Sequence, residues 1–197
     1  MRWRYLRVSL SPFQAHLTSR LQGRIPVTVQ DPAVREAAVA LIVGSEPDSI
    51  LLIRRAERNG DPWSGHMGLP GGRRDSSDEH LLATAIRETW EEVGLTLSPH
   101  QLLGTLDDVA PRSQSPTPVF ARPFVFGVPG QPDLRPNVEV SAARWVPLKE
   151  LTSPAILRDF ILTIGGEART FPAYHLDEGT VWGMTERMLT SLFEIIQ

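Results

Sequence analysis

The chain has 197 residues, a formal net charge of −3 and no cysteine. This length suits one domain around one core, and the small negative charge gives no general attraction to nucleic acid or to an anionic membrane, so we expect neither as a partner. Because cysteine is absent, disulfides, thiol nucleophiles and cysteine-ligated zinc or iron–sulfur centres are excluded. The sequence has no apolar run of about 18 residues and no signal-peptide core, which predicts a cytoplasmic protein.

The beginning of the chain is interpreted as an extension of the main domain. A short amphipathic helix is predicted over 12–22, ahead of prolines that oppose regular structure. We therefore divide the chain into an N-terminal extension, 1–30, and one domain, 31–197. In that domain the aliphatic runs 37–44 and 50–55 flank the turn-favouring sequence Gly-Ser-Glu-Pro-Asp-Ser, and this pattern predicts a β-hairpin.

A glycine-rich, irregular segment is expected at 56–72, and a helix at 78–93. At about 100° per residue, the apolar positions of that helix fall on one broad face, which we expect to be buried. These positions are Leu81, Leu82, Ala85, Ile86, Thr89 and Val93. Gly94 follows them as a helix stop.

The rest of the chain mixes strands and helices in irregular order. Strands are predicted at 102–106, 118–128 and 138–148, and helices at 154–164 and 181–196. The connection 107–118 is long for a loop without structure of its own, so it is a candidate for the lining of a binding site. This order of elements indicates a layered α/β or α+β domain.

Three glutamates, Glu88, Glu91 and Glu92, lie within one turn of the predicted helix. Like charges at these spacings repel one another and cost a few tenths of a kcal/mol on an exposed helix. One interpretation is a solvated face on which Arg87 pairs with Glu91. The other is a site for a hard divalent cation, since Mg²⁺ takes oxygen ligands from a few carboxylates together with phosphates and water. The spacing alone does not separate the two.

The residues around this turn resemble the signature of the Nudix hydrolases, which is a glycine, a spacer, Arg-Glu, two residues, Glu-Glu, one residue, glycine and an aliphatic residue. The chain has Gly72 and later Arg87-Glu88-Thr89-Trp90-Glu91-Glu92-Val93-Gly94-Leu95. The resemblance implies a Nudix-like α/β/α sandwich with a mixed sheet. Arg87 follows Gly72 by fifteen positions, where the general signature has fourteen, so the upstream acid is either Asp78 or Glu79. Thr89 stands where an aliphatic residue is usual.

This resemblance implies that the chain hydrolyses a diphosphate linked to another group. Glu88, Glu91 and Glu92 are then the catalytic metal ligands, for Mg²⁺ or Mn²⁺, and Arg87 orients them by an ion pair. Such a cation would neutralise the diphosphate and lower the pKa of an attacking water, while a further carboxylate takes the proton. Glu139 is a candidate for that further ligand or base, and an exposed strand residue is the equally weighted alternative.

Upstream of the helix, the chain resembles the coenzyme A diphosphatase branch of the family. The matching residues are Leu51-Leu52, Arg55-Ala56, Gly65 and Pro70-Gly71-Gly72. Gly60 stands where the branch has an arginine, and Leu69 where it has a phenylalanine. The resemblance implies coenzyme A or an acyl-CoA as the substrate. The candidate substrate-binding residues that it implies are Arg55, Gly71, Gly72 and Arg73.

Two features of this stretch have alternative interpretations. Its glycines either let the backbone approach a phosphate or form a tight turn, and His66 either touches substrate or caps that turn. Four aromatic residues could stack on an adenine, but we interpret them as core residues. They are Trp63, Phe120, Phe124 and Tyr174.

Other functions stay open within the same resemblance. A Nudix enzyme could act on ADP-ribose, dinucleotides or nucleoside triphosphates, and a Nudix fold could also serve as a non-catalytic nucleotide-binding regulator. Retention of the three glutamates and of Arg87 favours an enzyme, because a module that only binds has no evident need for a costly acidic turn. The expected partner is a small nucleotide or coenzyme. The oligomeric state is left open, a homodimer included.

Overall fold

The computed structural model describes residues 10–31, 33–57, 64–112, 118–164 and 166–197. Within these ranges the helices are α1 (Pro12–Gln22), α2 (Leu81–Val93), α3 (Leu148–Leu151) and α4 (Gly183–Ile196), with a 3₁₀ turn at Pro99–Gln101. The strands are β1 (Arg35–Gly44), β2 (Ser49–Arg55), β3 (Met67–Gly68), β4 (Gly71–Arg73), β5 (Leu102–Thr105), β6 (Val119–Val128), β7 (Val140–Pro147), β8 (Leu157–Ile164), β9 (Glu167–Leu176) and β10 (Gly179–Trp182). In this part of the chain, none of the helices has both the length and the apolar character needed to span a membrane.

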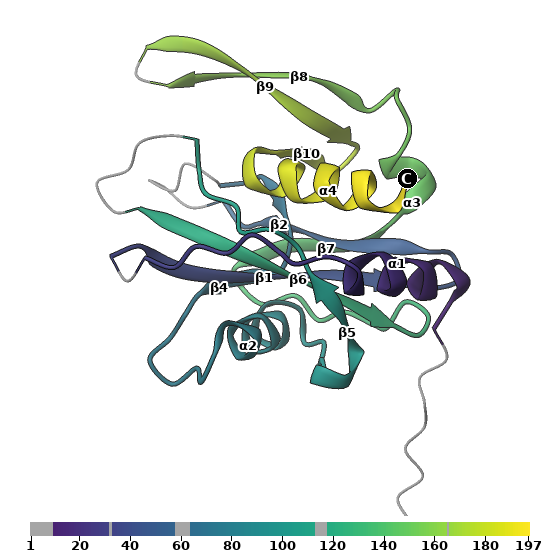
Figure 1. The fold of residues 1–197 in the computed structure, drawn as a ribbon. Coiled ribbons are helices and arrows are strands. Elements are labelled where there is room, and N and C mark those ends of the chain that lie inside the picture. The colour runs from purple at the N-terminus through teal and green to yellow at the C-terminus, as the bar shows by residue number, and fades with distance from the viewer. Residues whose placement is uncertain (1–9, 32, 58–63, 113–117, 165) are drawn as a thin grey trace, which may run out of the picture.

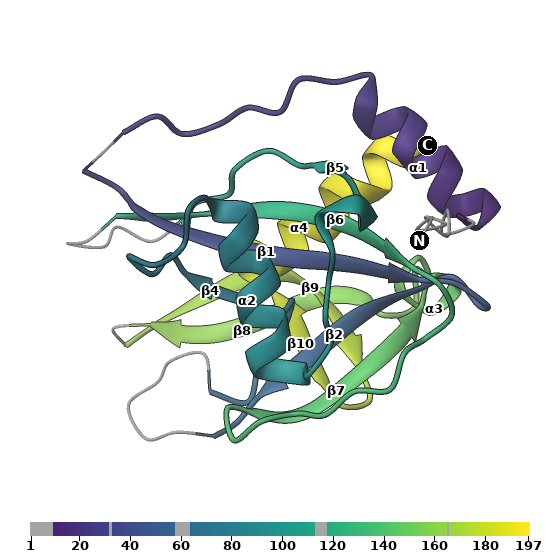
Figure 2. The same cartoon turned by 90° about the horizontal axis from the view of Figure 1, so that it is seen from below.

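One mixed sheet joins the described strands in the order β5-β6-β1-β2-β3-β10-β9-β8, with β4 paired to β1 and β7 paired to β2. Strand β1 runs parallel to β6 and antiparallel to β2. Figure 1 shows α2 below the central strands and α4 above them, and Figure 2 gives the view from below. Helix α1 packs on the α4 side, since Leu17 and Leu21 belong to the same core as Leu189. The predicted α/β/α sandwich with a mixed sheet is confirmed.

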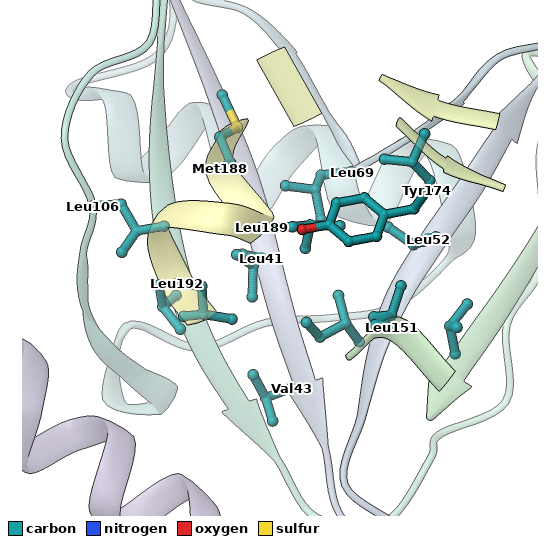
Figure 3. Close-up of a cluster of buried hydrophobic side chains, with 14 of the residues drawn as sticks. Leu41, Val43, Leu52, Leu69, Leu106, Leu151, Tyr174, Met188, Leu189 and Leu192 are labelled. Carbon is teal, nitrogen blue, oxygen red and sulfur yellow. The ribbon is translucent and has the colours of Figure 1, made fainter. Parts of the chain in front are cut away.

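Both faces of the central strands are buried, which is what their nearly unbroken aliphatic sequences predict for strands covered by helices on either side. On the α4 side, Leu41 and Leu52 belong to the same core as Leu189 (Figure 3). On the α2 side, Ile42 belongs to a second core with Ala85. Successive residues of β1 alternate between the two cores, because side chains of a strand point to opposite faces in turn.

The N-terminal helix predicted at 12–22 is confirmed as α1. Ser11 caps it, and the buried side chain of Gln14 donates hydrogen bonds of 2.9 Å to the carbonyl oxygens of Val43 and Val128. Because unsatisfied buried amides are costly, these bonds fix α1 against β1 and β6. The first described residues are thus packed onto the sheet, and the division of the chain at residue 30 remains a proposal.

The loop predicted at 107–118 holds the segment that follows α1. Asp107 accepts a 2.7 Å hydrogen bond from the backbone N–H of Val27, and Asp108 accepts one of the same length from Val29. Residues 113–117 of this loop lie outside the described ranges. Its predicted role in lining a binding site stays a prediction.

Most other predicted elements are confirmed. The runs 37–44 and 50–55 form the antiparallel pair β1 and β2, with Val43 opposite Ile50. The three later strands are found as β5, β6 and β7. The last helix is α4, which begins at Gly183 because the residues before it form β10.

The helix predicted at 154–164 is wrong, because Leu157–Ile164 form strand β8. This strand pairs with β9 along its whole length. Leu157 and Ile161 are four residues apart, a spacing that fits one face of a helix and equally one face of a strand. Only the partner strand, which was not predicted, decides between the two.

Two smaller boundaries also differ from the prediction. The segment 56–72, expected to be irregular, contains the two-residue strand β3 and the start of β4. The helix expected from residue 78 begins at Leu81, with His80 as its N-cap. Asp78 lies outside the helix, where its carboxylate accepts hydrogen bonds from the backbone N–H of Asp75 and from Arg87.

Candidate active site

Asp78 anchors the residues of α2 that carry the acidic turn. Its side chain is only 5% exposed and accepts two hydrogen bonds of 3.0 Å from the guanidinium of Arg87, one on each oxygen. Thr84 Oγ1 and the backbone N–H of Asp75 donate to the same carboxylate. The hydrogen bonds from Arg87 hold the pKa of the Asp78 carboxyl well below its ordinary value.

Glu79, the other acid that the sequence left open, is exposed, and its side chain makes no hydrogen bond or ion pair within the described ranges. Its backbone carbonyl and that of Asp78 accept hydrogen bonds from Arg74, which also pairs with Glu36 at 2.7 Å. Of the two acids, Asp78 is therefore the one in contact with Arg87. The sequence reasoning missed Arg74, since no motif marks an arginine that binds backbone carbonyls.

Arg87 joins the acidic turn to strand β4. Its Nη1 lies 2.9 Å from Glu88 Oε1 and 3.2 Å from Glu91 Oε2. Its Nη2 donates to the backbone carbonyl of Arg73 at 3.2 Å. The planar guanidinium thus meets three carboxylates and a carbonyl, a pattern for which arginine is better suited than lysine. The ion pair between Arg87 and Glu91 expected for a solvated face is present, but it is one part of a larger network.

Glu92 is buried, with 5% of the residue exposed, and its Oε2 accepts a 2.9 Å hydrogen bond from the backbone N–H of Gly71. Burial raises the pKa of Glu92 to about 7, while the bond from Gly71 and the charge of Arg55 act in the opposite direction. Burial also raises the pKa of Glu88, against the influence of Arg87. Two of the three glutamates are therefore held where their charged forms are poorly solvated.

Strand β4 passes very close to Glu88. A methyl group on Gly72 would lie 2.6 Å from Glu88 Oε2 and would overlap the rest of that carboxylate. The register Ala38 opposite Gly72 fixes this strand against β1. Any larger residue at this position would displace the carboxylate of Glu88, which gives a physical reason for glycine next to the acidic turn.

The donor set fits a hard divalent cation. Glu88 and Glu92 supply carboxylate oxygens in a partly dry setting, and a cation beside them would favour their charged forms. Within the described residues, no three His, Asp or Glu side chains converge as a complete cage. The predicted set of Glu88, Glu91 and Glu92 is therefore not gathered as a three-ligand site in the described ranges, and its role as the metal-binding set stays a proposal. Mg²⁺ is commonly bound by one or two carboxylates, with phosphate oxygens and water as the other ligands.

The remaining predicted site residues are Arg55, Glu139 and Arg73. Arg55 lies at the end of β2, and its positive charge lowers the pKa of Glu92. Glu139 lies before β7, and its negative charge raises the same pKa. The carbonyl of Glu139 accepts a 2.8 Å bond from the N–H of Ala56, which holds the two segments together. Glu139 is exposed and sits in a loop rather than in the strand predicted at 138–148. Arg73 reaches the network through its backbone carbonyl.

The aromatic residues interpreted as core are buried in the described part of the chain. Phe120 and Phe124 lie in the core on the α2 side, and Tyr174 in the core on the α4 side. Trp63 lies outside the described ranges. The three described rings are therefore unavailable for stacking on a substrate.

We predict that Asp78→Asn destabilises the protein by about 2–4 kcal/mol, because breaking a buried ion pair on one side leaves a charge without its partner. Glu79→Gln is the matched control and should change stability by less than about 0.5 kcal/mol. Urea unfolding of the two variants measures the difference. Equal stabilities would contradict the role of Asp78 as the anchor of Arg87.

The fold and this centre together define a class of enzyme: a layered α/β hydrolase in which a helix presents clustered carboxylates beside a Gly-Gly strand. The comparisons with known proteins agree. Residues 34–163 match the NUDIX domain. NudL of Photorhabdus laumondii, described as an uncharacterized Nudix hydrolase, is 30% identical over 164 residues, which are 83% of this chain and 86% of that protein. The chain belongs to the Nudix hydrolase family.

Two further likenesses differ in extent. The uncharacterized protein C14C4.10c of Schizosaccharomyces pombe is 43% identical over 111 residues, which are 53% of this chain and only 33% of the yeast protein. A MutT/nudix family protein from Enterococcus faecalis has a solved structure that matches 93% of this chain with a TM-score of 0.57 at 16% identity, covering 69% of that structure. The second likeness concerns the fold alone.

Proposed function

We propose that this protein hydrolyses the diphosphate bond of coenzyme A or an acyl-CoA, with Mg²⁺ or Mn²⁺ bound by Glu88, Glu91 and Glu92. Nudix hydrolases act on nucleoside diphosphate derivatives and generally use divalent metal ions. The observation that carries the metal-dependent part of the proposal is the burial of Glu92 and the partial burial of Glu88 against the Gly71-Gly72 backbone, with Glu88 beside the guanidinium of Arg87. Such a centre is suited to an ion that binds phosphate oxygens at the same time.

In the proposed reaction, Glu88, Glu91 and Glu92 would hold the metal ion, which would supply positive charge to neutralise the diphosphate and to lower the pKa of the attacking water. The water oxygen forms a new bond to one phosphorus, the bridging P–O bond breaks, and the proton of the water passes to a carboxylate. Glu139 is the proposed acceptor of the proton, since its negative charge raises the pKa of Glu92 and its side chain is exposed. Arg87 and Asp78 hold the acidic turn in place.

The preference for coenzyme A rests on the resemblance of the sequence from Leu51 to Gly72 to the coenzyme A diphosphatase branch. Arg55, within this stretch, carries a charge that lowers the pKa of Glu92. Arg55, Arg73 and the backbone of Gly71 and Gly72 are the proposed substrate contacts. The alternative enzymes act on ADP-ribose, dinucleotides or nucleoside triphosphates, and a nucleotide-binding regulator without catalysis is the alternative from another class. The cytoplasmic location and a homodimeric state also stay proposals.

A substrate panel tests the function. Wild type and Glu91→Gln are incubated with Mg²⁺ and coenzyme A, ADP-ribose, dinucleotides or nucleoside triphosphates, and products are identified by mass spectrometry. Glu91 is exposed, so its replacement should leave the fold intact, and Glu194→Gln, on the exposed side of α4, is the matched control. We expect cleavage of coenzyme A by wild type and by the control only.

Two outcomes would contradict parts of the proposal. No turnover of any compound, or equal turnover by Glu91→Gln, removes the enzymatic role of the acidic turn. Cleavage of ADP-ribose far faster than coenzyme A leaves the hydrolase in place and removes the assignment of the substrate.

A further inference from the structure

Four aromatic side chains form a continuous surface that belongs to neither core. They are His66, Phe160, Phe171 and Trp182, called here the aromatic wall. The ring of Trp182 lies at the centre, with its centroid 5.2 Å from that of His66, 5.4 Å from Phe160 and 5.3 Å from Phe171. All four residues are partly exposed. Large rings gathered on a surface outside the core commonly mark a binding site.

The register of the strands places the wall on the same face of the sheet as α2. Met67 of β3 pairs with Val181 of β10, and both side chains lie in the core on the α4 side. Their chain neighbours His66 and Trp182 therefore point to the opposite face, because successive side chains of a strand alternate. The same alternation runs on through β9 and β8.

Phe171 and Phe160 continue this face at the edge of the sheet. Tyr174 of β9 pairs with Val181 and points into the core on the α4 side, so Phe171, three residues earlier, points away from it. Phe160 of β8 is the direct cross-strand partner of Phe171. Figure 1 shows this hairpin, β8 with β9, rising beyond α4 and away from the central strands.

The wall begins at His66, whose backbone pairs with that of Arg55, a candidate substrate-binding residue. The carbonyl of His66 accepts a 3.1 Å hydrogen bond from the N–H of Arg55, and the charge of Arg55 acts on Glu92. From β3 the wall crosses β10 and β9 to β8, which is three strand spacings or roughly 14 Å. A group attached to a diphosphate at the glutamates would need an extended chain to reach Phe160.

The angles between the rings also favour a flexible chain, rather than a flat base, as the bound part of the ligand. The ring planes meet at 84° for His66 and Trp182, 43° for Trp182 and Phe160, and 52° for Trp182 and Phe171. None of these pairs forms the parallel slot that holds a flat base between two faces. Rings that are tilted to one another along an extended surface instead offer apolar contact area to a flexible, apolar chain of the ligand.

We propose that the aromatic wall is the specificity-determining surface for the long apolar arm of the substrate, the acyl-thioester side of an acyl-CoA. This inference rests on the proposed function, and it adds the residues that select the arm. His66 then has a place at the start of this surface, next to Arg55, rather than a role confined to the turn.

The test compares Phe160→Ala with Ile161→Ala on substrates that differ only in the arm. Ile161 is the next residue of β8, is 66% exposed and points to the opposite face, so it is a matched control. The substrates are coenzyme A and its acetyl, hexanoyl and decanoyl thioesters, with ADP-ribose as a diphosphate that lacks the arm. Thermal unfolding checks that each variant is folded, and Phe171→Ala serves as a second variant.

For wild type, we expect kcat/KM to rise with chain length. Phe160→Ala and Phe171→Ala should lower kcat/KM for the decanoyl thioester roughly tenfold, as the loss of apolar contact predicts, with less than about a twofold change for ADP-ribose. Ile161→Ala should match wild type on every substrate. An equal loss on ADP-ribose would assign the wall to the nucleoside and overturn the proposal, as would the absence of any chain-length preference.

A binding measurement separates this inference from the proposed function. Calorimetry in EDTA, where metal-dependent turnover stops, compares decanoyl-CoA with coenzyme A. Tighter binding of the decanoyl compound to wild type, lost in Phe160→Ala, supports the wall even if no coenzyme A compound is hydrolysed. Equal binding of the two compounds to wild type contradicts the proposed role of the aromatic wall, even if both compounds are hydrolysed.

Discussion

Glu92→Gln is expected to lower kcat roughly 10³-fold or more and, in the absence of metal, to make the protein more stable than wild type. The loss of activity corresponds to several kcal/mol of transition-state stabilisation by the proposed metal centre. Glutamine keeps an oxygen that can accept the hydrogen bond from Gly71, so the change removes charge with little change of shape.

The gain in stability follows from the burial of this carboxyl. Its pKa is raised from 4.5 to about 7 in the folded protein, so the folded chain binds the proton more tightly than the unfolded chain does. Stability therefore falls as the pH rises from about 4.5 to about 7, and above that range the charged group costs about 3 kcal/mol. Glutamine carries no charge, so the variant should not show this fall.

Urea unfolding between pH 4 and pH 8 in EDTA measures the effect. The difference between Glu92→Gln and wild type should grow from pH 4.5 to pH 7 and then stay constant. Mg²⁺ should stabilise wild type more than the variant, because an ion that binds only the folded state adds to its stability. A variant less stable than wild type at pH 8 in EDTA would show that the burial of Glu92 carries no cost.

The acidic turn was predictable because everything that defines it is local in the sequence. Glu88, Glu91 and Glu92 are neighbours through the helical period alone, and Arg87 reaches two of them from the same helix. The apolar face of α2 was predictable for the same reason, including the buried Thr89, whose hydroxyl donates to the carbonyl of Ala85.

Features that depend on contacts between separate elements were not predictable. The choice of Asp78 over Glu79 depends on which side of the turn faces Arg87, and the spacing of the signature, with its extra residue, left both positions open. The approach of Gly72 to Glu88 depends on the pairing of β4 with β1. The identity of β8 as a strand depends on β9, which the sequence did not reveal. In each case the deciding contact is with another segment of the chain, which is the next strand in sequence for β8 and a distant strand for β4.

Replacing each glycine of β4 by alanine should have a different effect, on stability for Gly71 and on activity for Gly72. Gly71 has φ of 151°, and a methyl group there would lie 2.6 Å from Val39 Cα and overlap the carbonyl of Ala38. Both obstacles are backbone atoms in the middle of a buried strand, so neither can move aside. We expect Gly71→Ala to destabilise the protein by about 3–5 kcal/mol.

Gly72→Ala should instead lower activity while changing stability by only about 1 kcal/mol or less, because the added methyl group meets the flexible end of Glu88. Displacing that carboxylate by about 1 Å is expected to lower kcat roughly 10²-fold. If the effect acts through Glu88, then Gly72→Ala combined with Glu88→Gln should lose no more activity than Glu88→Gln alone, since the two changes remove the same interaction. Steady-state kinetics with urea unfolding measures both quantities. Additive losses would mean that Gly72 contributes to catalysis independently of Glu88, and a stability loss as large as that of Gly71→Ala would mean that the carboxylate cannot move.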